Sequence, residues 1–183
     1  NVQEVINELE FNSKKNITEF DDYLIQTIHL QAKLVMWFLT STVRKFRDTA
    51  TRSLYYYGRK FPNEFYNLLL YSFDINDPYI NERMLAALYG ICMARHYELD
   101  GEFVNEFLIP KAKEIYSNMF KKNAKYSTTH ILKREYAFRI LELALYHKQD
   151  LFSELQKRRI FPPFKDGGIR KWYRSKKFSK YGG

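Results

Sequence analysis

The sequence predicts an all-α fold, an α-solenoid of about three antiparallel helical pairs, and three observations support this prediction. Apolar residues recur at helical spacing along most of the 183 residues, and no segment alternates polar and apolar residues over the length of a strand. Glycine and proline number only 7 and 5, although the turns of strand-rich folds draw heavily on both. The apolar pattern also repeats along the chain, which is typical of stacked helical units.

The first two helices follow from apolar periodicity and from the residues that flank it. One helix is expected from Ile17 to Leu39, with Thr18 as its cap and acidic residues in its first turn, where they favour the helix dipole. The next helix is expected to be capped by Ser41 or Thr42 and to stop near Gly58.

Proline placement defines the middle of the chain. Pro62 suits the first turn of a helix that reaches Phe73. Asp77 followed by Pro78 is the clearest helix start, an N-cap residue before a proline at the first helical position. Pro110 should kink or split the helix expected over 101–120.

Two more helices are expected before the pattern is lost. Ser127 or Thr129 should cap a helix that reaches Ala144, and a short helix is expected from Leu151 to Arg158. Clear periodicity ends at 162–163, where two prolines follow one another.

An apolar triplet marks an internal repeat. The second copy follows the first after 34 residues, and the third follows the second after 52. The three copies are Phe46, Ala50 and Leu54, then Ile80, Met84 and Leu88, then Leu132, Tyr136 and Ile140. Because one helical pair cannot bury both of its faces, we expect the pairs to stack on one another.

One copy of the repeat resembles a known helical motif. The segment from Asp77 to Leu88 resembles the second helix of a HEAT repeat, whose pattern is Asp-Pro-x-Val-Arg-x-x-Ala-x-x-Ala-Leu. The segment from Phe46 to Leu54 matches the Val-Arg-x-x-Ala part, and Thr129 to Ile140 is a looser third copy. The resemblance implies a HEAT-like solenoid and gives no information about activity.

The copies depart from the HEAT pattern at polar positions. Asn81 replaces the usual arginine, Lys133 stands at the same position of the third copy, and Val43 occupies the aspartate position of the first. These departures put in doubt a regular polar ladder between repeats, although they leave the stacking intact.

A narrower resemblance covers roughly residues 38–94. The stretches 38–42, 46–51 and 74–87 look like a helical region of very large bacterial NTPases of the STAND class, which includes NACHT-type and antiviral-defence proteins. This resemblance implies a cytoplasmic parent protein with its ATPase module elsewhere, and a solenoid that serves as a sensor or scaffold arm. The first residue is Asn and not Met, which also indicates a processed form or part of a longer protein.

Motifs of catalysis and of cofactor or metal binding are not found. The sequence has no P-loop and no Gly-x-Ser-x-Gly, and its four histidines are far apart, so we predict no catalytic, cofactor or metal site. An enzyme site assembled from distant residues is the class that the sequence leaves open. The single cysteine, Cys92, should be a small buried residue, as a reducing compartment permits. Since no run of about 18 apolar residues occurs, no membrane span is expected.

The balance of basic and acidic residues differs between two parts of the chain. Residues 157–183 hold ten Lys/Arg and one acid, whereas residues 1–156 hold 20 of each sign. We therefore predict a HEAT-like repeat domain over 1–156 and a basic aromatic tail, extended or irregular, over 157–183. Cations interleaved with aromatic rings suit nucleic acid, an anionic membrane or an acidic protein region. The candidate anion- or nucleic-acid-binding residues are Arg158, Arg159, Arg170, Lys171, Trp172, Arg174, Lys176 and Lys177.

The second helices of the pairs carry the candidate contacts to a partner. The cations outside their apolar pattern are Arg44, Lys45, Arg52, Arg83 and Arg134. The predicted function is contact with a protein partner, or with other domains of the parent chain, and the alternative is a nucleic-acid-binding module. The tyrosines at 55–57, 66, 71 and 79 form either a further binding surface or the half-buried border of thin helical layers.

Overall fold

The computed structural model describes residues 1–15 and 22–161, and this part of the chain is helical throughout, with no strands. The predicted all-α class is confirmed. The α-helices are α1 (Val2–Lys14), α2 (Asp22–Trp37), α3 (Arg44–Lys60), α4 (Pro62–Phe73), α5 (Pro78–Arg95), α6 (Ile109–Ile115), α7 (Ile131–His147) and α8 (Glu154–Ile160). Shorter helical stretches are η2 (Phe38–Thr40), η3 (Phe103–Leu108) and η4 (Tyr116–Phe120). Within the described residues, no helix has the length and apolar character of a membrane span.

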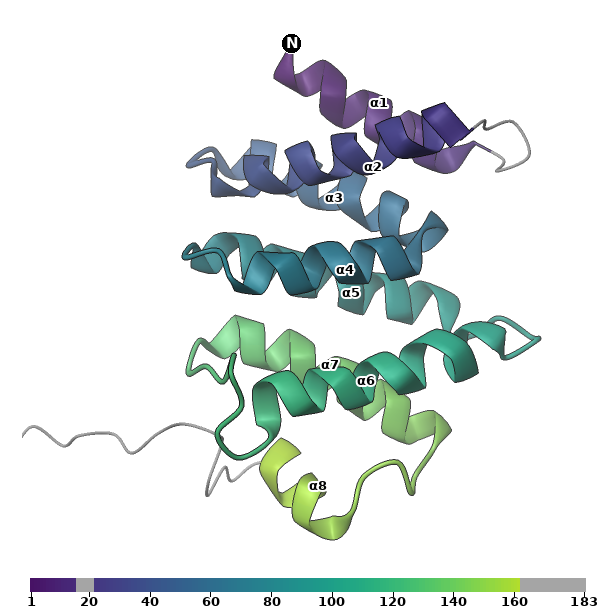
Figure 1. Cartoon of the computed structure of the whole chain (residues 1–183), viewed down its shortest axis with the longest axis vertical. Helices are drawn as coiled ribbons and strands as arrows, with labels where there is room; N and C mark the ends of the chain where they lie inside the picture. Colours follow the sequence, from purple (N-terminus) through teal and green to yellow (C-terminus); the bar gives the residue numbers. More distant parts are fainter. Residues whose placement is uncertain (16–21, 162–183) are drawn as a thin grey trace, which may run out of the picture.

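The helices form two layers that stack along one axis. Figure 1 shows α2, α4 and α6 in front of α3, α5 and α7, with α1 at the top and α8 at the bottom. Helix α3 packs between α1 and α5, and α5 packs between α3 and α7. Buried side chains run through the whole stack, from Ile6 in α1 to Ile160 in α8.

Contacts between the helices of the rear layer show that they run parallel. Near their N-terminal ends, Arg83 of α5 donates to Asp48 of α3 at 2.7 Å. Near their C-terminal ends, Arg95 donates to the Arg59 carbonyl at 3.2 Å. These partners lie 35 and 36 residues apart in sequence, close to the repeat offset of 34 residues.

The contacts between α5 and α7 join residues that lie further apart in sequence. Lys133 donates to the Asn81 side chain at 3.2 Å, and the rings of His96 and His147 approach to 3.2 Å between Nδ1 and Nε2. The separations in sequence are 52 and 51 residues, which match the second offset of the repeat. The third apolar triplet is looser than the others, because Leu132 is 45% exposed.

The polar position of the repeat makes an interior contact in each copy. Arg47 donates to the Ser41 carbonyl at 2.6 Å, and Asn81 donates to the Ser72 carbonyl at 2.8 Å. Lys133 completes the series by its bond to Asn81, which joins α7 to α5. An arginine, an asparagine and a lysine thus occupy the same position of the three repeat copies, and each makes a hydrogen bond there.

One predicted helix cap is confirmed, and two predicted caps are wrong. Asp77 accepts from the backbone of Tyr79 at 2.8 Å, as predicted. Val43 stands at the N-cap of α3 without a side-chain bond, so the prediction of Ser41 or Thr42 as that cap is wrong. His130 caps α7 by accepting from Lys133, so the prediction of Ser127 or Thr129 is also wrong.

Gly58 does not end α3, which continues to Lys60. A Cβ added to Gly58 would lie 2.8 Å from Phe65 Cγ and still closer to Ile91 Cδ1. The helix thus ends near Gly58, as predicted, but the glycine itself is required by close packing against α4 and α5 and does not end the helix.

The helical segment around Pro110 runs without a gap from 102 to 120, so the proline does not split it, but the hydrogen-bonding pattern changes there. The π-helical stretch η3 precedes the proline, and the Ile109 amide donates to the Val104 carbonyl five residues back. Pro110 cannot donate a backbone hydrogen bond, so the helix changes its bonding pattern where the proline begins α6.

The ends of the chain differ from expectation. Helix α1 was not predicted; Asn1 caps it, and it buries Ile6 and Leu9 fully. The helix expected from Ile17 is described from Asp22 onward, and its predicted cap Thr18 lies outside the described residues. The short helix expected from Leu151 to Arg158 is found as α8, and because it continues to Ile160 the first residues of the predicted tail are helical and not extended.

Cys92 is buried, as predicted, with 1% of its surface exposed. Burial raises the pKa of its thiol to about 12, which leaves the group protonated and unreactive at neutral pH.

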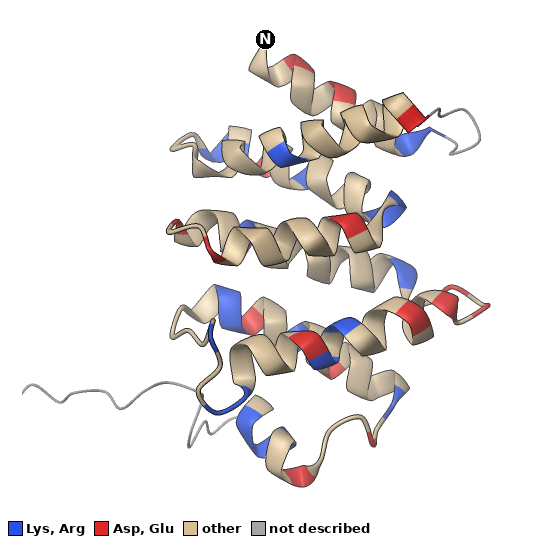
Figure 2. Ribbon diagram, in the orientation of Figure 1, with Lys and Arg blue, Asp and Glu red and all other residues tan. Residues whose placement is uncertain are grey.

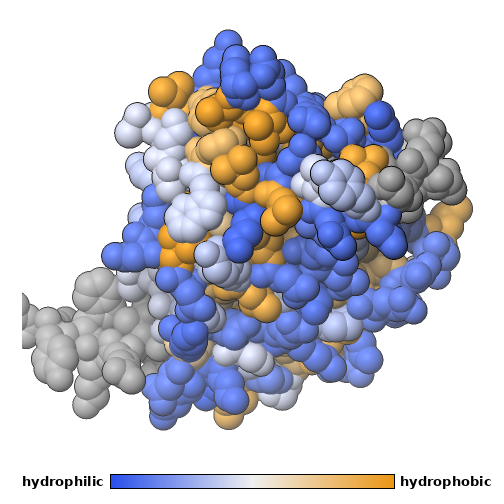
Figure 3. All heavy atoms as spheres, turned by 45° about the horizontal axis from the view of Figure 1, so that its top comes forward, coloured by the Kyte–Doolittle hydropathy of each residue, from blue (hydrophilic) through white to orange (hydrophobic). Residues whose placement is uncertain are grey.

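Hydrophobic side chains gather at the upper end of the stack. Figure 3 shows this apolar surface when the top of the molecule is turned forward. Helix α2 contributes Leu30, Leu34 and Trp37, which are 69%, 46% and 41% exposed, and α1 contributes Phe11, which is 62% exposed. Leu30, Leu34 and Trp37 lie three or four residues apart and therefore share one face of α2.

Candidate partner-binding site

Positive charge in the stack is concentrated on α3. The described residues hold 23 Lys/Arg and 18 Asp/Glu, and their excess of five equals that of α3 alone. Helix α3 holds one acid, Asp48, and six cations: Arg44, Lys45, Arg47, Arg52, Arg59 and Lys60. The even balance over residues 1–156 thus hides a strongly basic helix.

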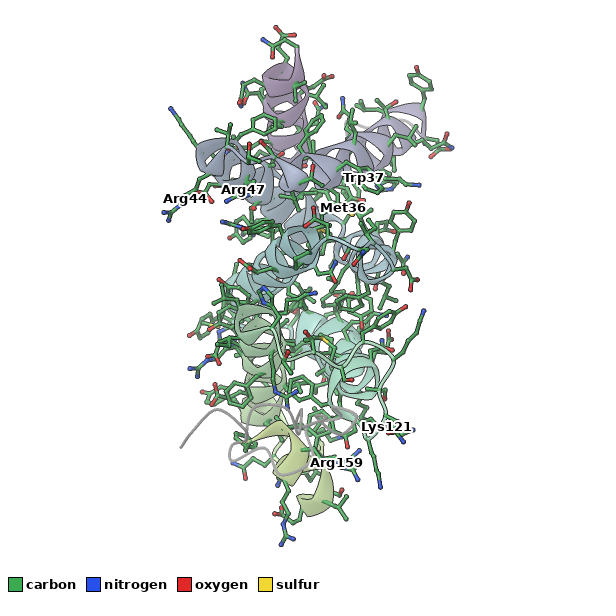
Figure 4. All side chains as sticks on the ribbon, turned by 90° about the vertical axis from the view of Figure 1, so that its left-hand side faces the viewer. Met36, Trp37, Arg44, Arg47, Lys121 and Arg159 are labelled. Atoms are coloured by element: carbon green, nitrogen blue, oxygen red, sulfur yellow. The ribbon has the colours of Figure 1, made fainter. Side chains whose placement is uncertain are left out.

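An open depression lies over the first half of α3. It has a volume of about 650 Å³ and is lined by Arg44, Lys45, Asp48, Thr49 and Arg52. We call it the α3 depression. It brings together three of the five predicted partner-binding residues. Figure 4 shows Arg44 pointing away from the stack, on the side opposite Trp37.

Two acids partly compensate these cations. Asp48 binds Arg83 at 2.7 Å and lies 3.7 Å from Arg44 Nε. Arg52 Nε lies 3.0 Å from Glu10 of α1. Among the described residues, Lys45 has no acid within ion-pair distance, so the depression keeps net positive charge.

Glu10 is held in its charged form. Partial burial of its carboxyl favours the neutral acid, but hydrogen bonds from Lys14 and Arg52 outweigh this and lower its pKa below the ordinary value. Arg52 is therefore anchored to α1 at neutral pH, with 59% of its side chain still exposed.

The first turn of α3 is an unfavourable place for cations. It holds Arg44, Lys45 and Arg47 and no acid, although the N-terminal end of a helix carries partial positive charge. An exposed charge opposed to the dipole costs roughly 0.3–1 kcal/mol. Arg47 has a structural use, because it binds the Ser41 carbonyl. Helix stability does not explain Arg44 and Lys45, which is why we regard them as functional candidates.

Cations at the opposite edge of the layer have a structural explanation. Lys14, Arg59, Lys60 and Arg95 occupy the last turns of α1, α3 and α5, where the dipole favours them. They line a second depression of about 380 Å³ together with Ser13, Tyr56 and Glu98. Lys60 and Arg95 donate there to backbone carbonyls at helix ends.

The other two predicted partner-binding residues are placed differently. Arg83 borders the α3 depression through Asp48, and 23% of its side chain is exposed. Arg134 lies apart from the others, with its guanidinium 4.6 Å from the Phe120 ring centre and a hydrogen bond to the Arg159 carbonyl. Burial lowers the pKa of Arg134 below its ordinary value. Its described contacts tie α7 to η4 and α8.

The predicted tail residues are described only at 158 and 159. Arg158 and Arg159 lie on α8. The remaining six, Arg170, Lys171, Trp172, Arg174, Lys176 and Lys177, lie outside the described residues.

The tyrosines differ widely in burial, and only Tyr55 and Tyr56 are half-buried as the second alternative expects. Tyr57 and Tyr66 are buried, and burial raises the pKa of both phenols. Tyr71 and Tyr79 are 46% and 50% exposed, and cations lie over both rings. They do not form a single surface.

Sequence reasoning missed the acids of the site. Asp48 follows Arg44 by four residues, a spacing that predicts an ion pair on a helix. Glu10 had no such signal, because it lies 42 residues from Arg52 in the sequence.

Groups suited to metal binding are few in the part of the chain that the structure describes. No cluster of three or more His, Cys, Asp or Glu side chains is placed to hold a metal ion there. The closest pair is His96 with His147, where burial and the neighbouring imidazole lower the pKa of His96.

Comparison with known proteins identifies no relative: no family model, no curated protein and no solved structure matches this chain.

Proposed function

We propose that this chain is a HEAT-like solenoid segment of about three helical pairs that acts as a protein-contact arm of a larger bacterial STAND-type NTPase. The parallel rear helices support the solenoid, since their facing residues are separated by the offsets of the repeat. The STAND parent and its cytoplasmic location rest on the resemblance of residues 38–94 to that class. The chain contributes contact, and nucleotide hydrolysis belongs to the parent.

The α3 depression carries the proposal of a partner site. Arg44 and Lys45 stand where the helix dipole disfavours them, and they remain exposed. Lys45 and Arg52 are seven residues apart, so both project from one face of α3. A surface kept at some cost in stability is best explained by a partner that supplies the missing negative charge.

The acids in and beside the depression favour a protein partner over a polyphosphate chain. Asp48 lines the depression between the cations, and Glu10 pairs with Arg52 at its border, so both would repel a continuous row of phosphates. A folded protein can place carboxylates opposite Lys45 and Arg44 and neutral groups opposite Asp48. Such matching gives specificity as well as affinity.

The apolar upper end supports a place within a longer assembly. Terminal repeats of solenoids need a polar outer face, whereas α1 and α2 expose Phe11, Leu30 and Leu34. Another repeat or another domain of the parent would cover these side chains.

Site-specific cross-linking tests the partner site. A photoreactive residue replaces Lys45 in the full-length protein, and a matched control carries it at Lys113, an exposed lysine of α6. We expect a protein adduct that forms at position 45 and not at position 113, and that is lost when Arg44→Glu and Arg52→Glu are added. Adducts of equal yield at both positions, or an adduct with nucleic acid at position 45, would contradict the proposal.

The parent class has a separate test. The full-length protein should contain a P-loop outside this segment, and a full-length sequence without one removes the STAND assignment. The cross-linking result stands independently of that outcome.

A further inference from the structure

A second basic surface lies at the opposite end of the stack from the apolar one. The link between η4 and α7 carries Lys121 and Lys122, and α8 carries Arg158 and Arg159. Figure 2 shows the basic residues of this link beside those of α8, and Figure 4 shows Lys121 and Arg159 close together in a view at right angles to it. We call these four residues the C-terminal basic surface.

The scaffold beneath this surface is well packed. Arg134 of α7 stacks on the ring of Phe120, the residue before Lys121, and also donates to the Arg159 carbonyl at 3.3 Å. Phe120 is fully buried. One α7 side chain thus holds the link and α8 together, and places cations that lie about 40 residues apart in sequence on one surface.

The charges of this surface are uncompensated. Residues 121–134 contain five Lys/Arg and no acid, although Lys125 of this stretch pairs with Asp74 at 2.8 Å. Within the described ranges 1–15 and 22–161, none of the four side chains has a carboxylate at ion-pair distance, whereas the neighbouring Lys157 pairs with Glu154 at 3.0 Å. The α3 depression differs, because acids alternate with its cations. Four cations without described acid partners suit a ligand that carries a row of negative charges.

We propose that the C-terminal basic surface binds the phosphate backbone of a nucleic acid. The sequence that follows α8 fits the same ligand, since residues 162–183 add seven Lys/Arg and one acid, with aromatic residues at 172, 173 and 178. Lysine and arginine contact phosphate oxygens without reading bases, so the binding is independent of sequence.

An anionic membrane fits the described part less well. Surface-bound helices present a broad apolar face beside their cations. Helix α8 has only seven residues, and Leu155 is its one largely exposed apolar side chain. Phosphate contacts need no such apolar face.

The salt dependence of binding tests the proposal on the full chain. The probes are fluorescently labelled single-stranded and duplex oligonucleotides of about 20 nucleotides or base pairs, titrated between about 50 and 200 mM salt. Each phosphate contact contributes about 0.7 to the slope of log K against log salt for a single strand and about 0.9 for a duplex. The variant Lys121→Gln/Lys122→Gln should therefore lower the slope by about 1.5, and so should Arg158→Gln/Arg159→Gln. The combined variant should lower it by about 3.

Matched controls separate this surface from general charge. Lys113→Gln/Lys148→Gln removes two exposed lysines that have no described ion pair and should leave the slope unchanged. Arg44→Gln/Lys45→Gln should also leave it unchanged, so failure of the α3 proposal would not affect this result. The far-ultraviolet circular dichroism of every variant is expected to match that of the wild type.

Three results would overturn the proposal. One is a slope that changes by less than about 0.5 in the combined variant. Another is an equal change in the Lys113/Lys148 or the Arg44/Lys45 control. The third is binding to phosphatidylserine vesicles with no binding to either oligonucleotide. A larger effect on the single strand or on the duplex identifies which form the surface prefers.

Discussion

Gly58 provides a sharp test of how the two layers pack. It lies inside α3, it is buried, and side chains of α4 and α5 pack against it. The change Gly58→Ala adds one methyl group to this position. Its Cβ would lie 2.8 Å from Phe65 Cγ, an atom that can move only if the fully buried ring changes its χ1 angle or if α4 shifts. Ile91 Cδ1 is closer still, but it is the end of a flexible side chain and can rotate away.

Two opposing contributions determine how much Gly58→Ala changes the free energy of unfolding. Overpacking of a close-packed core typically costs about 1–3 kcal/mol. Alanine is favoured over glycine within a helix by about 0.8–1 kcal/mol. The balance is a loss of about 0–2 kcal/mol, and we expect the upper half of that range because Phe65 is fully buried. Since 1 kcal/mol corresponds to about 2–4 °C in a domain of this size, Tm should fall by about 2–8 °C.

Urea denaturation followed by circular dichroism measures this loss directly. Gly90→Ala is the matched control, because its Cβ meets only Tyr55, at 3.2 Å, on a half-buried face of α5. We expect the control to be neutral or slightly stabilising. Equal or greater stability of Gly58→Ala would show that α3 and α4 are not in the close contact described above, and would refute the packing argument.

Three further predictions concern a cap, an ion pair and a histidine pair. Asp77→Ala should lower the free energy of unfolding by about 1 kcal/mol, measured in urea, because it removes the cap of α5; no loss would contradict the cap. Asp48→Asn should strengthen binding of the partner identified by cross-linking, since it releases Arg44 and Arg83 from their shared acid; weaker binding would show that Asp48 itself contacts the partner. Burial and the charge of His147 hold the pKa of His96 below its ordinary 6.5, so the unfolded chain binds more protons and stability should fall as pH decreases below that value. His96→Gln should flatten this decline in urea denaturation between about pH 5 and 8, and an unchanged decline would assign it to other groups.

Helix content and the order of the repeat could be read from the sequence because both are local. Apolar spacing over a few turns identified α2 to α7, and Asp77 with Pro78 located the start of α5. The offsets of 34 and 52 residues anticipated which residues of the rear helices face each other. Helix α1 escaped detection because its apolar residues are scattered among polar ones and only Ile6 and Leu9 of them are fully buried.

Caps and close contacts could not be read in the same way. Val43 begins α3 without a side-chain cap, and the His130 imidazole caps α7 in place of Ser, Thr or Asp. Both helices tolerate this because packing of a helix face contributes most of its stability in a protein. Gly58 resembled a helix end in sequence, yet it marks the approach of a neighbouring helix. Propensity describes one helix at a time and carries no information on its neighbours.

For the candidate sites, the sequence by itself determined which cations lie outside the apolar pattern of their helices, and Arg44, Lys45 and Arg52 were found in this way. Only the tertiary structure decided which of them share a surface and which are compensated. Glu10 meets Arg52 across 42 residues, Arg134 turns inward onto Phe120, and the link at Lys121 reaches Arg159 on α8. The physical reason is that helical periodicity is fixed within a few residues, whereas the rotation and register of one helix against the next are set by core packing along the whole stack.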